Sequence, residues 1–168
     1  GTNRRQRQMC IRDRNKFDII NLTENVFEML EFTAKKKKIK LTVNKDKGLE
    51  TKVIADKEKI EQVLTNLIDN SIKYGKDNGT TEIVIQSLNE DKIIVRVTDN
   101  GVGFKKENYT RIFERFFRVD RSGSRSAGGS GLGLAIVKHI IDAHDEKIYV
   151  ESEFGVGSEF SFTLEKSK

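Results

Sequence analysis

The 168-residue sequence lacks proline, and its only cysteine is Cys10. Without a cysteine pair there can be no disulfide and no thiolate metal site, which fits a reducing compartment. No apolar run is long enough to cross a membrane, and no apolar segment follows the basic start as it would in a secretory signal. We therefore expect a soluble, cytoplasmic chain.

The excess positive charge is confined to the start of the chain. The net charge is +5, and residues 1–14 hold five arginines and one aspartate, or +4, which leaves +1 for the rest. A near-neutral body argues against a nucleic-acid groove. Residues 4–13, RRQRQMCIRD, resemble a sequencing adapter translated in frame, and the alternative is a basic linker from an upstream domain. We interpret 1–14 as a leader outside the fold and 15–168 as one globular domain.

Three segments have the apolar spacing of amphipathic helices. They run from 18 to about 36, from 56 to about 75 and from 131 to about 143. Asp18 and Asp56 would cap the first two helices. The lysine run at 35–38 ends the first helix, and we interpret it as a solvated face that meets the helix dipole favourably, rather than a phosphate or membrane patch.

Segments rich in β-branched residues predict strands that pair in sequence order. The expected pairs are 39–43 with 52–55, 82–88 with 92–99, and 147–152 with 159–164. The second pair would lie at the centre of the sheet, and Phe160, Phe162 and Leu164 of the last strand would face one way. Residues 100–130 have little periodicity, which is typical of a functional lid.

Polar side chains form a stripe beside the apolar face of the second helix. They are Gln62, Asn66, Asn70, Lys73 and Tyr74. Amide oxygens can complete a magnesium shell that also holds phosphate oxygens and water, a lysine can neutralise phosphate, and a tyrosine can pack near a base or ribose. An ordinary polar helix edge would have the same pattern, but the neighbouring motifs favour a nucleotide site.

Asp99 ends a predicted strand that runs into the turn at 100–103, Asn-Gly-Val-Gly. A buried carboxylate accepts the exocyclic amino group of adenine, whereas it repels the carbonyl that guanine presents at the same place. The alternative is a capping aspartate in a tight Asp-Asn-Gly turn. This turn by itself leaves the two interpretations open.

A glycine loop, GGSGLGL, opens directly into the third helix. Gly129, Gly131 and Gly133 would let backbone amides approach an anion at the helix N-terminus. The loop lacks the Gly-Lys-Ser/Thr of a P-loop, and a lid rather than a strand precedes it, so it is not a dinucleotide fingerprint. The pattern predicts a phosphate site of another kind.

Two arginines upstream of this loop, Arg115 and Arg118, lie among Phe113, Phe116 and Phe117. The aromatic side chains would anchor the lid to the body and leave one or both arginines free to meet a terminal phosphate. The alternative is a surface amphipathic turn.

Four motifs occur in a fixed order: EQVLTNLIDNSIKY, DNGVGF, RIFERFFRVDRS and GGSGLGL. With them, the sequence from about Lys16 to Leu164 strongly resembles the catalytic ATP-binding domain of bacterial sensor histidine kinases, in the superfamily of gyrase, Hsp90 and mismatch-repair ATPases. They look like the family's asparagine box, first glycine box, phenylalanine box and second glycine box. The resemblance implies an α+β, two-layer sandwich of the Bergerat type. Three helices would cover one face of a mixed, mostly antiparallel sheet, with ATP and Mg²⁺ under a lid at about 100–130.

The resemblance also implies roles for single residues. Asn70 would ligate Mg²⁺, while Asn66 and Lys73 would serve the metal or the phosphates. Tyr74 would line the nucleotide, and Asp99 would read adenine. The other implied residues are Gly101 and Gly103, which shape the pocket, Arg115 and Arg118, which contact phosphates, and Gly129, Gly131, Leu132, Gly133 and Leu134, which close over them.

One position separates branches of the superfamily. Hydrolytic members resembling gyrase place a glutamate, the general base for water, one turn before the magnesium asparagine, and here that position is Asn66. Transfer to a protein side chain is therefore favoured over fast hydrolysis. The family's acceptor is a histidine on a separate dimerisation domain. The chain holds only His139 and His144, which we interpret as polar helix or loop residues.

The resemblance implies an ATP-dependent histidine kinase domain of two-component signal transduction, which we expect to be monomeric in isolation. Its partners would be the histidine-bearing domain of a membrane-anchored parent protein and a downstream response regulator, with no nucleic acid and no membrane contact. The alternatives are an anti-sigma-type serine kinase, a slow ATPase and a nucleotide-sensing module without catalysis. Smaller departures from the family are Phe117, where tyrosine is common, and the pair 145–146, Asp-Glu, where two glycines are common.

Overall fold

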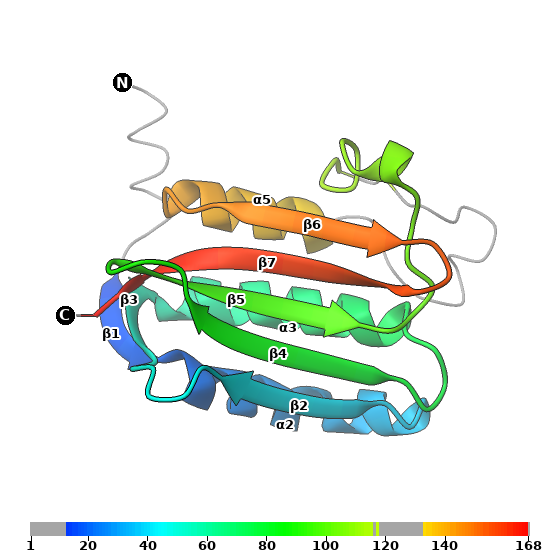
Figure 1. Cartoon of the computed structure of the whole chain (residues 1–168), viewed down its shortest axis with the longest axis horizontal. Helices are drawn as coiled ribbons and strands as arrows, with labels where there is room; N and C mark the ends of the chain where they lie inside the picture. Colours follow the sequence, from blue (N-terminus) through cyan, green and yellow to red (C-terminus); the bar gives the residue numbers. More distant parts are fainter. Residues whose placement is uncertain (1–12, 116, 118–132, 168) are drawn as a thin grey trace.

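The computed structural model describes residues 13–115, 117 and 133–167. Within them, three helices cover one face of a seven-stranded sheet (Figure 1). The helices are α2 (Ile19–Lys36), α3 (Lys57–Lys73) and α5 (Gly133–Ala143). The strands are β1 (Arg14–Asp18), β2 (Lys40–Lys45), β3 (Lys52–Asp56), β4 (Thr80–Ser87), β5 (Lys92–Asp99), β6 (Ile148–Glu153) and β7 (Gly157–Lys166). The predicted two-layer α+β architecture is confirmed.

Both predicted helix caps are confirmed by hydrogen bonds. The carboxylate of Asp18 accepts the N–H of Ile20 at 2.9 Å, and that of Asp56 accepts the N–H of Lys59 at 3.3 Å. Such caps satisfy amides that lack a partner in the first helical turn. The apolar faces of α2, α3 and α5 then pack against the sheet and exclude water from one continuous core.

The sheet is mixed, and its strand order is β1-β3-β7-β5-β4-β2, with β6 also pairing with β7. Strands β2 and β4 are parallel, and the remaining pairs are antiparallel. The β4–β5 and β6–β7 hairpins are as predicted. Phe160, Phe162 and Leu164 of β7 are buried in the core, so their shared orientation is also confirmed.

The predicted pairing of 39–43 with 52–55 is wrong. Both segments are strands, but β2 lies beside β4, whereas β3 lies between β1 and β7. The alternation of side chains fixes which face of a strand is buried, and it carries no information about which strand lies next to it. Strand β1 is not among the predicted strands: in it Arg14, a residue of the predicted leader, pairs with Asp56.

The turn at 145–146, where the resemblance predicts two glycines, contains a position that favours glycine. Asp145 has φ 58°, in the left-handed region. The next residue, Glu146, is buried, and its carboxylate accepts from Lys92 Nζ at 2.6 Å and from Thr163 Oγ1 at 2.7 Å. A glutamate is therefore held at this position by one ion pair and one hydrogen bond.

The first part of the predicted lid packs on the body. Phe104 and Ile112 are buried, and the Phe113 ring meets Phe160 edge-on with 6.1 Å between centroids. Phe117 is partly buried against the core, with the Arg111 guanidinium 4.6 Å from its ring. Anchoring by aromatic side chains is confirmed for these positions, while the prediction for Phe116 lies outside the described residues.

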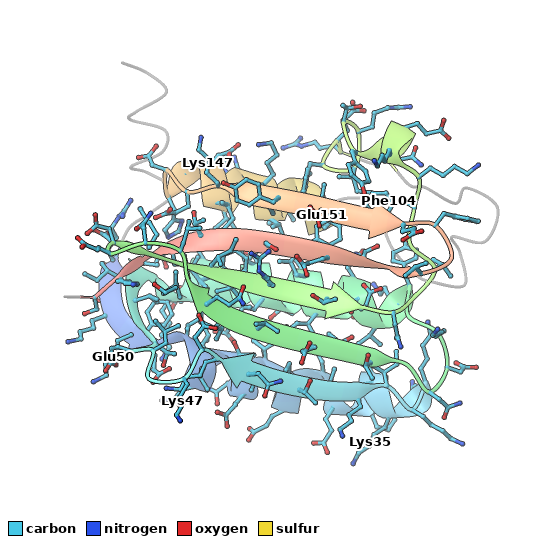
Figure 2. All side chains as sticks on the ribbon, in the orientation of Figure 1. Lys35, Lys47, Glu50, Phe104, Lys147 and Glu151 are labelled. Carbon is cyan, nitrogen blue, oxygen red and sulfur yellow. The ribbon has the colours of Figure 1, made fainter. Side chains whose placement is uncertain are left out.

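The ends of three elements lie toward one side of the sheet. Figure 1 shows the C-terminal ends of β5 and α3 and the N-terminal end of α5 at its right-hand side. In Figure 2 the labelled Phe104 lies at this side and Lys147 lies toward the opposite one. Among the described residues, no helix has both the length and the apolarity required to span a bilayer.

Candidate nucleotide site

The polar stripe of α3 lies beside the start of α5. Asn66, Asn70, Lys73 and Tyr74 are half-buried, and Gln62 is exposed one turn earlier. The Asn66 Nδ2 donates to the carbonyl oxygen of Gly133 at 3.4 Å. The structure therefore brings the predicted stripe together with the residue at which the glycine loop enters α5. Helix N-termini carry positive potential that attracts phosphate.

Asn70 has the chemistry of a magnesium ligand. Among the residues that the structure describes, none hydrogen-bonds the Asn70 side-chain amide, so its oxygen can still coordinate a cation. No group of three His, Cys, Asp or Glu side chains that could hold a metal occurs in the described ranges. Magnesium seldom occupies an all-protein cage and takes one or two protein oxygens together with substrate phosphates and water. The residues present fit a magnesium ion that arrives with a triphosphate.

Lys73, the expected phosphate cation, is already in an ion pair. Its Nζ lies 3.1 Å from Asp69 Oδ2, one helical turn earlier. The two side chains are about one third exposed (31% and 32%), so the pair is partly screened and weak. A phosphate would therefore have to share the Lys73 ammonium with Asp69 or displace the Asp69 carboxylate from it.

Asp99 ends β5 in the position predicted for a base-reading carboxylate. Its Oδ1 accepts the backbone N–H of Gly101 at 2.9 Å and that of Ser158 at 3.3 Å, and these two bonds fix the orientation of the carboxylate. Burial raises the pKa of Asp99 above the ordinary value for aspartate, and hydrogen bonds from Gly101, Ser158 and Ser71 oppose that rise. The charged carboxylate therefore has fewer hydrogen-bond donors around it than it would have in water, and an N–H group of a ligand would stabilise it.

The turn after Asp99 lies directly against the C-terminus of α3. The N–H of Val102 donates to the carbonyl oxygen of Tyr74 at 3.1 Å. A Cβ added at Gly101 would collide with the same oxygen, so only glycine permits this approach. Gly103 has φ 64°, where a side chain is strained. The geometry explains both predicted glycines and joins the turn after Asp99 to the amide-bearing helix.

The expected phosphate contacts are described only in part. Arg115 is exposed, and Gly133 and Leu134 are half-buried in the first turn of α5. The predictions for Arg118, Gly129, Gly131 and Leu132 lie outside the described residues.

Sequence reasoning missed a group of hydroxyls around Asp99. Ser71 lies within the apolar face of α3, yet its hydroxyl is buried and lies 2.6 Å from that of Thr81. Thr81 is the cross-strand partner of Asp99. A serine within an otherwise apolar helix face was the available signal, since a buried hydroxyl needs a partner. The Ser71 and Thr81 hydroxyls therefore lie on the α3 side of the Asp99 carboxylate.

The two histidines lie in different environments. His139 is exposed on α5. His144 follows that helix and is buried, with Nδ1 2.9 Å from the carbonyl oxygen of Ile140, and its Nε2 accepts the N–H of Asp56 at 3.1 Å. Burial lowers the pKa of His144, and the bond to Ile140 opposes the shift. His144 is therefore a neutral core residue that joins α5 to the start of α3, rather than a polar loop residue.

Comparisons with known proteins point to one family. The family model of histidine kinase-, DNA gyrase B- and HSP90-like ATPases matches residues 55–168. The sensor-like histidine kinase SenX3 of Mycolicibacterium smegmatis is 34% identical over 152 residues, which is 90% of this chain and 39% of that protein. The chain thus spans well under half the length of the curated relatives it matches.

Solved structures show the same fold. The catalytic domain of histidine kinase ThkA has a TM-score of 0.78 at 31% identity, covering 92% of this chain and 96% of that chain. ThkA in complex with response regulator protein TrrA has a TM-score of 0.74 at 29% identity, covering 92% and 42%. Full-length ShkA in complex with AMPPNP has a TM-score of 0.79 at 28% identity, covering 92% and 32%.

Proposed function

The chain belongs to the family of histidine kinase-, DNA gyrase B- and HSP90-like ATPases, and on this premise we propose that it is the catalytic domain of a two-component sensor kinase. In this proposal the domain binds ATP with Mg²⁺ and donates the γ-phosphoryl group to a histidine on another domain. Relatives named sensor-like histidine kinase, and the ShkA complex with AMPPNP, support it.

The observation that carries the proposal is the meeting of two chemistries at one edge of the fold. The Asp99 carboxylate, held by two backbone amides, lies on the sheet side, and the amide stripe of α3 lies on the helix side. The bond from Val102 to Tyr74 joins the two. A purine amino group at the first and a metal-bound triphosphate at the second match the two ends of ATP.

Each residue would then have a defined task. Asp99 would accept the adenine amino group, and Tyr74 would line the nucleotide. The Asn70 oxygen would coordinate Mg²⁺, which supplies Lewis-acid stabilisation of charge that develops on the phosphates. Asn66 would orient phosphate or metal-bound water, and Lys73 would neutralise phosphate once released from Asp69.

The absence of a carboxylate at position 66 favours transfer over hydrolysis. Asn66 donates to Gly133, and an amide cannot take a proton from water as a glutamate can. The nucleophile would be an imidazole, which attacks as the neutral base and needs no strong general base. Both ring nitrogens of the buried His144 are engaged, by Asp56 and Ile140, and the family's acceptor is on a separate dimerisation domain, so we propose that the acceptor is outside this chain.

A response regulator would then receive the phosphoryl group from that histidine. The structure of ThkA in complex with response regulator protein TrrA supports this partner class. No nucleic acid is needed for either step, and the near-neutral body of the domain fits that expectation.

Calorimetry of the purified chain with ATP and Mg²⁺ tests the proposal. We expect binding at micromolar strength or weaker, negligible turnover alone, and acid-labile phosphorylation of a histidine domain taken from a close relative. An acid-stable phosphoserine on a partner protein would instead support the anti-sigma-type serine kinase. If the folded chain bound no adenine nucleotide, the proposal would be abandoned.

A further inference from the structure

Lys37, one of four consecutive lysines, differs from its neighbours in what it contacts. Lys35 pairs with Glu31 at 3.0 Å, and Lys36 lies 4.8 Å from the Phe32 ring. The sequence predicted a solvated run at the end of α2. The Lys37 side chain instead turns away from its own helix and is half-buried.

The Lys37 ammonium caps the C-terminus of the neighbouring helix. Its Nζ donates to the carbonyl oxygens of Ile72 at 3.1 Å, Lys73 at 2.5 Å and Gly75 at 3.2 Å. The last carbonyls of a helix have no partner within it and carry the negative end of its dipole. An ammonium has three N–H donors, and all three are used here. Figure 1 shows that α2 and α3 end at the same side of the sheet.

The carbonyls that accept from Lys37 lie on both sides, in sequence, of the Tyr74 carbonyl, which supports the 99–103 turn. Between Lys73 and Gly75 lies Tyr74, whose carbonyl oxygen accepts the N–H of Val102 at 3.1 Å. The segment 72–75 is therefore held both by the Lys37 ammonium and by the N–H of Val102. A shift of this segment would move the metal-binding stripe relative to Asp99.

We propose that Lys37 is a positioning residue of the nucleotide site, which sets the α3 terminus against the 99–103 turn without touching the ligand. The inference rests on the proposed nucleotide site. It assigns a long-range role to a residue that the sequence places in a solvated run. Because Asn70 lies within one turn of the capped carbonyls, losing the cap should weaken MgATP binding by about tenfold.

The test compares four chains: wild type, Lys37→Met, Lys37→Arg and Lys38→Met. The last variant removes the same charge from the adjacent, exposed residue. Two quantities are measured below the melting transition: the dissociation constant for MgATP by calorimetry, and the exchange rate of the Val102 amide by NMR. The second reading needs no ligand and reports directly on the Val102–Tyr74 bond.

For Lys37→Met we expect a dissociation constant about tenfold higher and faster Val102 exchange. Lys37→Arg keeps a cation with N–H donors and should recover most of both losses, and Lys38→Met should show neither. If Lys37→Met lowered the melting temperature but left both readings at wild-type values, the contact would only stabilise the fold and the inference would be wrong. Should Lys37→Met not fold, Lys37→Gln replaces it and is judged on the same two readings. Wild-type protein that binds no adenine nucleotide would instead refute the proposed function.

Discussion

Replacing Asp99 by asparagine tests how the site selects its base. The new side chain can keep an acceptor oxygen where Oδ1 receives the N–H groups of Gly101 and Ser158, so the turn should stay folded. The amide nitrogen would then take the place of the second carboxylate oxygen. A donor would face the donor amino group of adenine, and neither could find a partner once the bound nucleotide covers the partly buried Asp99.

The expected loss follows from that mismatch. A buried donor left unsatisfied costs about 2 kcal/mol, which corresponds to roughly a 30-fold weaker dissociation constant for ATP. GTP should not weaken in parallel, because its carbonyl accepts from the new amide. The ratio of ATP to GTP affinity should therefore collapse. Calorimetry or a fluorescent-nucleotide competition assay measures both constants.

A pH series sharpens the same test. Burial raises the pKa of Asp99, so wild-type affinity for ATP should fall as pH drops through that raised pKa, because the protonated acid is a poorer acceptor. The Asp99→Asn variant has no such step. Asp142→Asn, on the exposed face of α5, is the matched control and should bind as wild type. If Asp99→Asn left both the strength of ATP binding and its pH dependence unchanged, the carboxylate would not read the base.

Three further predictions concern the frame of the site. Gly101→Ala should lower the free energy of unfolding by about 1–3 kcal/mol and abolish MgATP binding, because the added Cβ meets the Tyr74 carbonyl oxygen. If urea denaturation gave the wild-type stability, the close approach would be refuted. Lys38→Gly should raise the free energy of unfolding by about 0.5–1 kcal/mol, since φ at this position is 57°, and a drop in urea midpoint would contradict that reasoning. Burial lowers the pKa of His144, so its neutral form contributes fully above about pH 6.5, and stability should fall as pH drops from there toward the lowered pKa. In His144→Gln that part of the decline should vanish, and parallel stability curves for the two proteins would argue against a neutral buried imidazole.

Much of the local structure could be predicted because its causes are local. Asp18 and Asp56 precede apolar helical patterns, and both caps formed as expected. Alternation identified β4, β5, β6 and β7 and the burial of Phe162. Strand neighbours were harder to predict: the pattern predicts that β2 and β3, which a short turn connects, pair with each other, but β2 pairs with β4, and β3 and α3 lie between them in the sequence.

The candidate site also divides into features with local causes, which could be predicted, and features that depend on tertiary packing. Asn66, Asn70 and Tyr74 could be placed on one stripe from helical spacing, and the resemblance assigned Gly101 to the pocket. The close approach of Gly101 to the Tyr74 carbonyl oxygen required the packed structure. That the stripe meets the start of α5 through Gly133 required the packed structure. The ion pair that occupies Lys73 in the described structure was not anticipated either, although its four-residue spacing made it available.

The sequence by itself determined which functional groups the chain carries and their order along it: the amide stripe, the aspartate at a strand end and the glycines. Helix caps and side-chain alternation also belong to it, because they depend on residues within a few positions of one another. Tertiary structure alone decided that Lys37 caps α3, that His144 is buried, and that β1 and β7 flank β3. These contacts join residues far apart in sequence, and their choice depends on how all the apolar faces are buried at once, which no short pattern encodes.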